Sequence, residues 1–331
     1  MEIWKPDEKG ISCAAEALQN GKLVGMPTET VYGLAGNALN AKAVASIFDV
    51  KQRPTFDPLI VHAATLEDAF ALAASVPPVA RHLAEVFWPG PLTLVLPRRS
   101  DLPDLLSAGL ETIALRVPSH PVARQLLDEC QLPLAAPSAN RFGRISPTTA
   151  EHVTGEFSEN PEVAGVLDAG ACEMGLESTV VGFPGGNRVV VYRLGATPLE
   201  ELNDHVDVLE WVRVADAEDN PELAKRGEQS PGMLARHYAP RTPLRLLEEG
   251  ADIPNTDAGT GWLSFQGHPG LEGPQEVLSV DGDLREAANR LFACLRRLDD
   301  MGLKQIIAWK VPDQGLGAAI NDRLTRAAAL E

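Results

Sequence analysis

Short runs of apolar residues, each bounded by turn-forming residues, mark the first part of the chain. Runs of this length, rich in Val, Ile and Leu, are typical of strands buried on both faces of a sheet. The pattern leaves the order and direction of these strands open. It predicts strands over the ranges Leu23–Met26, Leu59–His62, Leu92–Leu96, Ile113–Val117, Leu134–Ala136, Val166–Asp168, Thr179–Phe183 and Arg188–Arg193.

Apolar residues between several of these runs recur at helical spacing instead. In Ala41–Val50 they share one face, and in Val79–Phe87 the same spacing puts Val86 on a buried face with Leu83. Strands that alternate with amphipathic helices predict an α/β fold, in which helices cover a sheet.

The segment Asp216–Pro240 differs from the rest because it is polar, contains three prolines and shows no period. We interpret it as a linker. Beyond it the apolar pattern returns and predicts strands at Leu244–Leu247, Gly261–Phe265, Glu276–Ser279 and Gln305–Trp309, with helices near Leu284–Asp300 and Ala318–Leu330.

The length of 331 residues exceeds the usual size of a single core, so two domains are expected. The patterns place a first domain at residues 1–210, a linker or lid at 211–240, and a smaller α/β domain at 241–331.

Composition narrows the class of protein. Hydrophobic residues make up 44% and charged residues 23%, as in ordinary globular proteins. The formal charge of −17 argues against a broad nucleic-acid surface, because phosphate backbones favour exposed Lys and Arg. Any anionic ligand must therefore meet a local basic pocket.

The cysteines and the N-terminal sequence indicate whether a zinc site, disulfides or a secretion signal should be expected. The four cysteines form no CxxC pair, so neither a zinc site nor a disulfide framework is indicated. The N-terminal residues do not resemble a secretion signal, and no apolar run approaches the length of a membrane span. We therefore expect a cytoplasmic protein with no membrane contact.

Hydroxyl residues follow the first predicted strand, where Thr28 and Thr30 lie in the run Met26–Leu34. Ligands of open α/β folds gather at such strand ends. An ordinary turn, with a threonine as cap, explains the same residues equally well.

Two cations, Lys51 and Arg53, precede Pro54 in the run KQRPTFDPLIVH, which also contains Asp57 and His62. In an extended segment, side chains two positions apart point to the same side, so the pair could hold a polyphosphate. Alternatively, the cations complement the dipole of a helix that ends near them, and His62 is an ordinary core histidine.

Arg116 lies inside an apolar predicted strand. An arginine in that setting must reach a carboxylate, a phosphate or solvent, because burying it unpaired is costly. A ligand carboxylate would satisfy this need, and so would a structural ion pair with an acidic residue.

Ser138 and Asn140 follow another short apolar strand and would both present hydrogen-bonding groups at its end, suited to phosphate or ribose. Further along, Ser146 stands near Thr148, and Thr148 with Glu151 fits a capping box for a helix.

Three further signals are weak when taken singly: Gly175–Val181, Arg193–Gly195, and Ser230–Met233 with His237–Pro240. Met, His and Tyr are unexpected in an exposed linker, and they suggest a segment that folds over a site.

Together these segments resemble the threonylcarbamoyl-AMP synthases, the YrdC-like family, in its longer form with an additional C-terminal domain. The resemblance rests on the ordered motifs PTETVYGL, KxRP with PLxxH, WPGPLT, the RVP strand, PSAN with SPT, ESTVV, SPGMxxxHYAP and GLGxAIxDRLxRAA. It covers essentially the whole chain, and several motifs in order are far more specific than one.

The resemblance implies a YrdC-like twisted sheet whose helices form a concave basic site, with a smaller Rossmann-like C-terminal α/β domain. It implies the substrates L-threonine, bicarbonate and ATP, with Mg²⁺ carried by the nucleotide and no metal site of the protein's own. The residues implied at ATP are Lys51, Arg53, Asp57, Thr112, Ser138, Asn140, Ser146, Arg193 and Tyr238, with Lys51 and Arg53 as the catalytic pair. Those implied at threonine are Thr30, His62, Arg116 and Ser178.

The resemblance also implies a reaction and partners. Threonine carbamate would attack the α-phosphate of ATP, and the adenylate product would pass to a tRNA threonylcarbamoyl-transferase for t6A modification. Weak tRNA binding is compatible with this scheme. An RNA-binding module that uses the same basic concavity is the main alternative. A second alternative is a different acyl- or carbamoyl-adenylate former on a similar fold, such as a hydrogenase-maturation relative, and the absence of the zinc-finger cysteines expected there counts against it.

Overall fold

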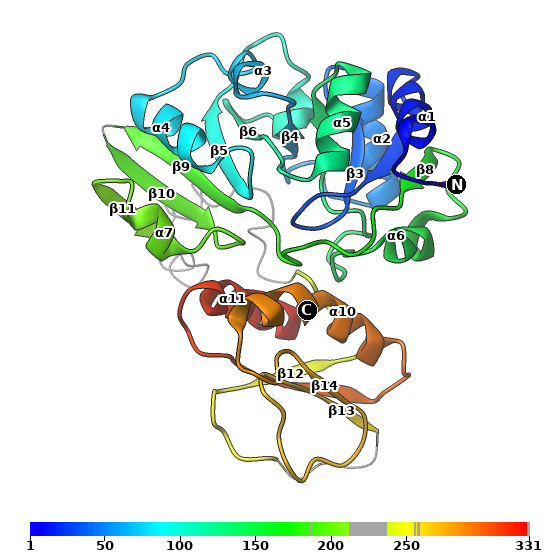
Figure 1. Ribbon diagram of the computed structural model, residues 1–331, viewed down its shortest axis with the longest axis vertical. Helices are drawn as coiled ribbons and strands as arrows, with labels where there is room; N and C mark the ends of the chain where they lie inside the picture. The colour runs from blue at the N-terminus through cyan, green and yellow to red at the C-terminus, as the bar shows by residue number, and fades with distance from the viewer. Residues whose placement is uncertain (186, 212–236, 255, 257–258, 330–331) are drawn as a thin grey trace.

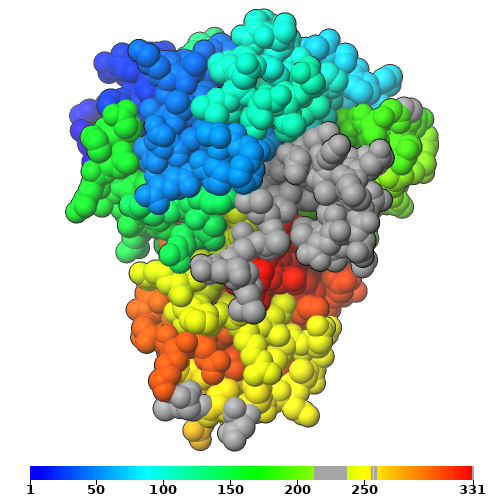
Figure 2. Space-filling view, turned by 180° about the vertical axis from the view of Figure 1, so that it is seen from behind, coloured from blue at the N-terminus to red at the C-terminus, as the bar shows by residue number. Residues whose placement is uncertain are grey.

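The computed structural model describes residues 1–185, 187–211, 237–254, 256 and 259–329. The strands within these ranges form two sheets, one of eleven strands and one of four. Figure 1 shows the sheets in two bodies, and Figure 2 shows the bodies from behind as lobes of unequal size. We call residues 1–211 the N-terminal body and residues 241–329 the C-terminal body. Among the described residues, no helix has the length and apolar character needed to cross a membrane.

The large sheet mixes parallel and antiparallel neighbours in the order β1-β8-β2-β3-β7-β4-β6-β5-β9-β10-β11. Its strands are β1 (Glu2–Trp4), β2 (Leu23–Met26), β3 (Gly33–Asn37), β4 (Ile60–His62), β5 (Leu92–Pro97), β6 (Thr112–Arg116), β7 (Leu134–Ala135), β8 (Val163–Leu167), β9 (Thr179–Gly185), β10 (Arg188–Arg193) and β11 (Val208–Trp211). Strands β4 and β6 run parallel, with His62 opposite Arg116. Their carboxyl ends therefore lie side by side at one edge of the sheet.

Helices of the N-terminal body begin where local capping favours them. The Asp7 side chain accepts a hydrogen bond from the Gly10 N–H at the start of the first helix, and Asn40 caps the second in the same way. The helices are α1 (Glu8–Gln19), α2 (Ala41–Lys51), α3 (Leu66–Phe70), α4 (Pro78–Phe87), α5 (Pro121–Cys130), α6 (Ala150–Phe157) and α7 (Leu199–Asn203), with a 3₁₀ turn at Asp104–Ser107.

Most predicted elements are confirmed, β2 and β10 with identical bounds. Three strands were not predicted: β1, β3 and β11. Strand β3 has the sequence GLAGN, which contains no β-branched residue and so carries no strand signal. Two local predictions were wrong. Val86 is exposed, and α6 is capped by Thr149, whose hydroxyl accepts from the His152 N–H, instead of by Thr148.

The C-terminal body has the predicted α/β pattern. Its strands are β12 (Leu244–Leu247), β13 (Thr260–Ser264), β14 (Gln275–Val277) and β15 (Gln305–Trp309), all parallel in the order β12-β15-β13-β14. Helices α10 (Leu284–Asp299) and α11 (Leu316–Ala328) lie between this sheet and the N-terminal body (Figure 1). The helices can therefore touch the large sheet's loops.

Candidate active site

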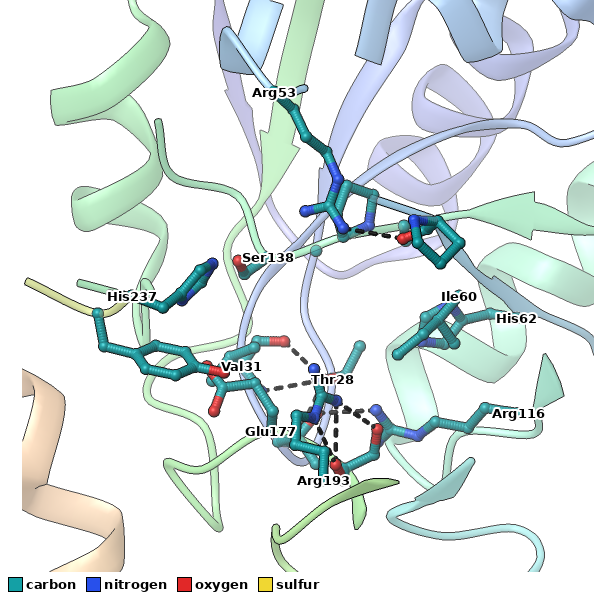
Figure 3. Close-up of a pocket in the computed structure, with 17 residues that line it drawn as sticks. Thr28, Val31, Arg53, Ile60, His62, Arg116, Ser138, Glu177, Arg193 and His237 are labelled. Carbon is teal, nitrogen blue, oxygen red and sulfur yellow. Dashed lines mark hydrogen bonds between the residues drawn. The ribbon is translucent and has the colours of Figure 1, made fainter. Parts of the chain in front are cut away.

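A cavity lies at the edge of the large sheet, where several strands end. Its free volume is about 50 Å³. Figure 3 shows Arg53 at one end, with Arg116 and Arg193 at the other. The other polar residues in its wall are Thr28, Thr30, His62, Ser138, Glu177, Ser178, His237 and Tyr238. Segments far apart in the sequence thus meet at one site.

Arg53 forms a buried ion pair with Asp57. Its Nη2 lies 2.9 Å from Asp57 Oδ1, Nε donates to the Asp57 carbonyl at 3.0 Å, and Nη2 donates to the Pro58 carbonyl at 2.8 Å. The guanidinium carbon lies 5.8 Å from the centre of the Phe142 ring. Arg53 lines the cavity, whereas Asp57 holds the arginine from behind.

Lys51 does not line the cavity. It is the last residue of α2, and Gln52 follows it in a left-handed conformation, so the expected extended segment is absent here. The Lys51 Nζ donates to the carbonyls of Ser138 at 2.6 Å and Asn140 at 2.5 Å. Burial, with the nearby charge of Arg53, lowers the pKa of Lys51 well below its usual value. This corrects the expectation that Lys51 faces the same ligand as Arg53.

Arg116 meets both alternatives raised by its sequence context. It lines the cavity, and its Nη2 also lies 2.7 Å from Glu29 Oε1 in a buried ion pair. The Nη1 donates to Thr30 Oγ1 at 2.9 Å and Nε donates to the Gly90 carbonyl at 3.1 Å. The contacts with Glu29, Thr30 and Gly90 leave part of the five N–H donors of the guanidinium group unused. Arg116 therefore has donor capacity left for a ligand.

Two buried groups beside Arg116 have shifted pKa values. Burial would raise the pKa of Glu29, but the charge of Arg116 and the backbone N–H of Ser119 outweigh it and leave the pKa lowered. Burial, with the charge of Arg116, lowers the pKa of His62 to about 3. Glu29 is therefore ionised near neutral pH and His62 is neutral.

Arg193 is the last residue of β10 and contacts the hydroxyl group of Ser178. Its Nε and Nη2 donate to the Ser178 carbonyl at 3.1 and 2.9 Å, and Nη2 also reaches Ser178 Oγ at 3.1 Å. Ser178 Oγ lies 2.7 Å from Thr93 Oγ1. Arg193 and Ser178 are thus held as a unit.

The remaining expected residues divide into two groups. Asn140 and Ser146 lie behind the cavity: Asn140 Nδ2 donates to the carbonyls of Arg141 and Arg144, and Ser146 Oγ donates to Glu177 Oε1 at 2.5 Å. Thr112 begins β6, about 13 Å along the strand from Arg116 at roughly 3.3 Å per residue. The structure does not bring Thr112 to the cavity wall.

His237 and Tyr238 enter the wall from the predicted lid. Both are buried, and burial with the charges of Arg53 and Lys51 lowers the pKa of His237 well below its usual value. Phe292 of α10 stacks on Tyr238 with ring centres 5.7 Å apart. Residues 212–236 of the predicted lid, including Ser230–Met233, lie outside the described residues.

Three polar wall residues were not expected as individual site residues: Thr28, Glu177 and His237. Thr28 had been explained as a turn residue, and its hydroxyl does accept from the N–H groups of Thr30 and Val31. Glu177 stood in a flagged segment, but a glutamate gives no sequence signal for a place in a basic pocket.

The fold and the cavity define an α/β protein with a buried, arginine-rich pocket for a small anionic ligand. Comparison with known protein families supports this description. Residues 16–195 match the Sua5/YciO/YrdC family, described as Telomere recombination, and residues 198–329 match the threonylcarbamoyl-AMP synthase C-terminal domain.

Full-length relatives support the same assignment. The chain is 38% identical to a threonylcarbamoyl-AMP synthase of Pyrococcus abyssi, covering 99% of this chain and 95% of that one. It is 38% identical to that of Bacillus subtilis, covering 96% and 92%. The crystal structure of P. abyssi Sua5 complexed with L-threonine aligns with a TM-score of 0.87 and 35% identity, covering 99% and 98%. The chain belongs to the threonylcarbamoyl-AMP synthase family, in its two-domain form.

Proposed function

We propose that this chain makes threonylcarbamoyl-AMP and pyrophosphate from L-threonine, bicarbonate and ATP, as a nucleotidyltransferase. The observation that carries the proposal is the cavity, where three arginines, a neutral histidine and several hydroxyls surround one small space. Both full-length relatives named above are threonylcarbamoyl-AMP synthases, and the P. abyssi structure contains L-threonine.

The proposed chemistry has two steps. The threonine amine and bicarbonate give a carbamate and water. A carbamate oxygen then attacks the α-phosphorus of ATP, the bond from that phosphorus to the bridging oxygen breaks, and pyrophosphate leaves. Neither step requires a nucleophile from the protein. Catalysis would come from alignment of the reactants and stabilisation of charge on the phosphates.

The Arg116 end of the cavity suits the amino acid. Arg116 retains N–H donors beyond those that contact Glu29, Thr30 and Gly90, so it can bind the threonine carboxylate while Glu29 balances its charge. Thr30 and Ser178 supply hydroxyls beside it. His62 is neutral, so it can hydrogen-bond the substrate without adding charge.

Arg53, at the opposite end of the cavity, suits the nucleotide, and we assign Arg193, which lies nearer Arg116, to the nucleotide as well. Fixed guanidinium groups in a low-dielectric site stabilise developing charge on phosphates more than they would in water. Ser138 and Tyr238 line the same space. Lys51 and Asn140 would act by holding the loop that carries Ser138. Direct ATP contacts by Asp57, Thr112 and Ser146 stay a prediction, since none of them lines the cavity.

The wall must open to admit substrates. The free volume of about 50 Å³ compares with about 10–15 Å³ for one water molecule on the same measure, so the cavity has room for a few water molecules and a nucleotide with an amino acid does not fit. His237 and Tyr238 form part of this wall. We therefore propose that the 237–238 segment moves when ATP enters.

Mg²⁺ is proposed to enter with ATP. The described residues contain no group of three or more His, Cys, Asp and Glu side chains that could hold a metal ion. Magnesium commonly keeps its waters and binds through substrate phosphates, so such a group is not required. When bound, the ion would reduce the charge of the phosphates. No residue of the chain is assigned as its ligand.

The RNA-binding alternative fits the cavity less well. Arg53, Arg116 and Arg193 are each less than 10% exposed, whereas binding of an RNA backbone depends on exposed cations. A cytoplasmic location, transfer of the product to a tRNA-modifying transferase and weak tRNA contact stay parts of the proposal.

A substrate-omission assay tests the function. Purified full-length chain with Mg²⁺–ATP should release pyrophosphate only when threonine and bicarbonate are both present, and mass spectrometry should detect threonylcarbamoyl-AMP. Replacing threonine by alanine provides a matched control. Pyrophosphate release that does not depend on threonine would contradict the proposal, as would salt-sensitive RNA binding without turnover.

A further inference from the structure

Arg323, on α11 of the C-terminal body, reaches the wall of the cavity in the N-terminal body. Its side chain is completely buried. The Nε donates to Glu177 Oε2 at 2.8 Å, and Nη2 donates to the Leu194 carbonyl at 2.7 Å. The guanidinium carbon lies 4.7 Å from the centre of the Tyr238 ring. One side chain thus contacts three segments next to the site.

Glu177 makes this contact significant. It lines the cavity, and a carboxylate there would repel an anionic ligand, because charges interact strongly in a buried site. Arg323 covers one carboxylate oxygen, and Ser146 Oγ donates to the other at 2.5 Å. Both carboxylate oxygens of Glu177 therefore accept hydrogen bonds, which reduce the negative charge that Glu177 presents to a ligand.

A purely structural ion pair explains the contact less well. Burying an Arg–Glu pair often contributes no more stability than apolar residues of similar size. Among the described residues, Asn289 Nδ2 also joins the two bodies by donating to the carbonyls of Cys172 and Glu173, and so does the Arg296–Glu156 pair, whose side chains are each 16% exposed. Arg323 is instead fully buried against two residues of the cavity wall, Glu177 and Tyr238.

Resting on the proposed function, we infer that Arg323 is a positioning residue for the nucleotide. It neutralises Glu177 and holds the ring of Tyr238, so that the C-terminal body completes the electrostatics of a pocket built by the N-terminal body. Arg323 does not itself line the cavity. It acts through the two wall residues that it contacts.

The test combines Arg323→Met with Glu177→Gln. Arg323→Met should raise the KM for ATP and the calorimetric Kd for ATP about tenfold or more, because an uncompensated carboxylate then faces the phosphates. The KM for threonine should change less than about threefold. The double variant removes both charges and should return the ATP values to within about threefold of wild type.

Arg297→Met is the control, because Arg297 forms an arginine–glutamate pair with Glu276 inside the C-terminal body, away from the cavity, with two contacts of 2.7 Å and a half-exposed arginine. It should leave the ATP values unchanged. Circular dichroism and the unfolding midpoint check the fold of each variant. If Arg323→Met fails to fold, the double variant, which leaves no unpaired Glu177 carboxylate, carries the test alone and should bind ATP.

Two outcomes would overturn the inference. One is a folded Arg323→Met chain that binds ATP as wild type does. The other is a folded double variant whose ATP affinity is no better than that of Arg323→Met, or which fails to bind ATP. Failure of the wild-type chain itself to bind ATP or form the adenylate would instead reject the proposed function, and the inference with it.

Discussion

The two bodies share an α/β architecture, but their sheets differ in the side chains that they bury. In the N-terminal body, the pairs Arg53–Asp57 and Arg116–Glu29 are buried at the strand ends. In the C-terminal body, the outer face of the sheet buries Trp262, Ile307 and Trp309 as an apolar cluster. Its pair Arg297–Glu276 has its arginine half-exposed.

This difference separates stability from function. A buried ion pair is expensive to desolvate and often adds no stability over an apolar replacement. An apolar cluster stabilises the fold in proportion to the apolar surface area that it removes from water. We infer that the buried pairs of the N-terminal body persist because they hold cations ready for a ligand, while the C-terminal sheet is built for stability.

The largest expected effect comes from Arg116→Ala. It should lower the free energy of unfolding by about 3–5 kcal/mol, because Glu29 is left buried and unpaired. It should also reduce kcat/KM for threonine by about a hundredfold or more. Chemical denaturation and pyrophosphate release measure the two effects.

The double variant Arg116→Ala with Glu29→Gln separates them. It should recover much of the stability, because Glu29 no longer leaves a buried charge unpaired. It should recover none of the activity, because Arg116, the proposed partner of the threonine carboxylate, is still missing. Recovery of activity along with stability would mean that Arg116 serves only the fold.

His62 gives a smaller effect that depends on pH. Its folded-state pKa of about 3 lies below its ordinary value of 6.5, so the unfolded chain binds a proton that the folded chain does not. Its contribution is fully present above about pH 6.5 and is lost as pH falls toward 3. Between these values, His62→Gln should reduce the slope of stability against pH by up to about 1.4 kcal/mol per pH unit.

Urea denaturation across this pH range makes the measurement. The slope caused by Glu29 needs separating, since its lowered pKa adds stability above its ordinary value of 4.5 that is lost as pH falls further. His120, His152 and His237 also have lowered pKa values and contribute between pH 5 and 6.5, so the contribution of His62 is the difference in slope between wild type and His62→Gln. His82→Gln, at an exposed position on α4, is the matched control. An unchanged slope in His62→Gln would mean that folding does not lower the pKa of His62, which would contradict a neutral His62 between pH 3 and 6.5.

Ile307→Val should have the smallest effect. It removes one methyl group from the apolar face of the C-terminal sheet and should cost about 0.5–1.5 kcal/mol of unfolding free energy. The KM values for ATP and threonine should not change. A raised KM for either would show that packing in the C-terminal sheet is coupled to the cavity and would weaken the contrast between the bodies.

Sequence patterns predicted most strands and helices because their apolar runs have local periods that the structure keeps. They failed where the signal was not local. Strand β3 is made of small residues and is recruited by its neighbours β2 and β7. Lys51 looked like a partner of Arg53, but α2 extends through it and turns its ammonium toward the 138–140 loop.

The sequence by itself determined the α/β character, the family and most of the polar residues in the wall of the cavity, because ordered motifs and apolar periods are properties of neighbouring residues. Only the tertiary structure decided which charges face one another. The partners Arg116 and Glu29, or Arg323 and Glu177, come from segments that meet only when the sheet closes and α11 packs against it. Their energies depend on burial and on distances of a few ångströms, and neither is encoded in the spacing of residues along the chain.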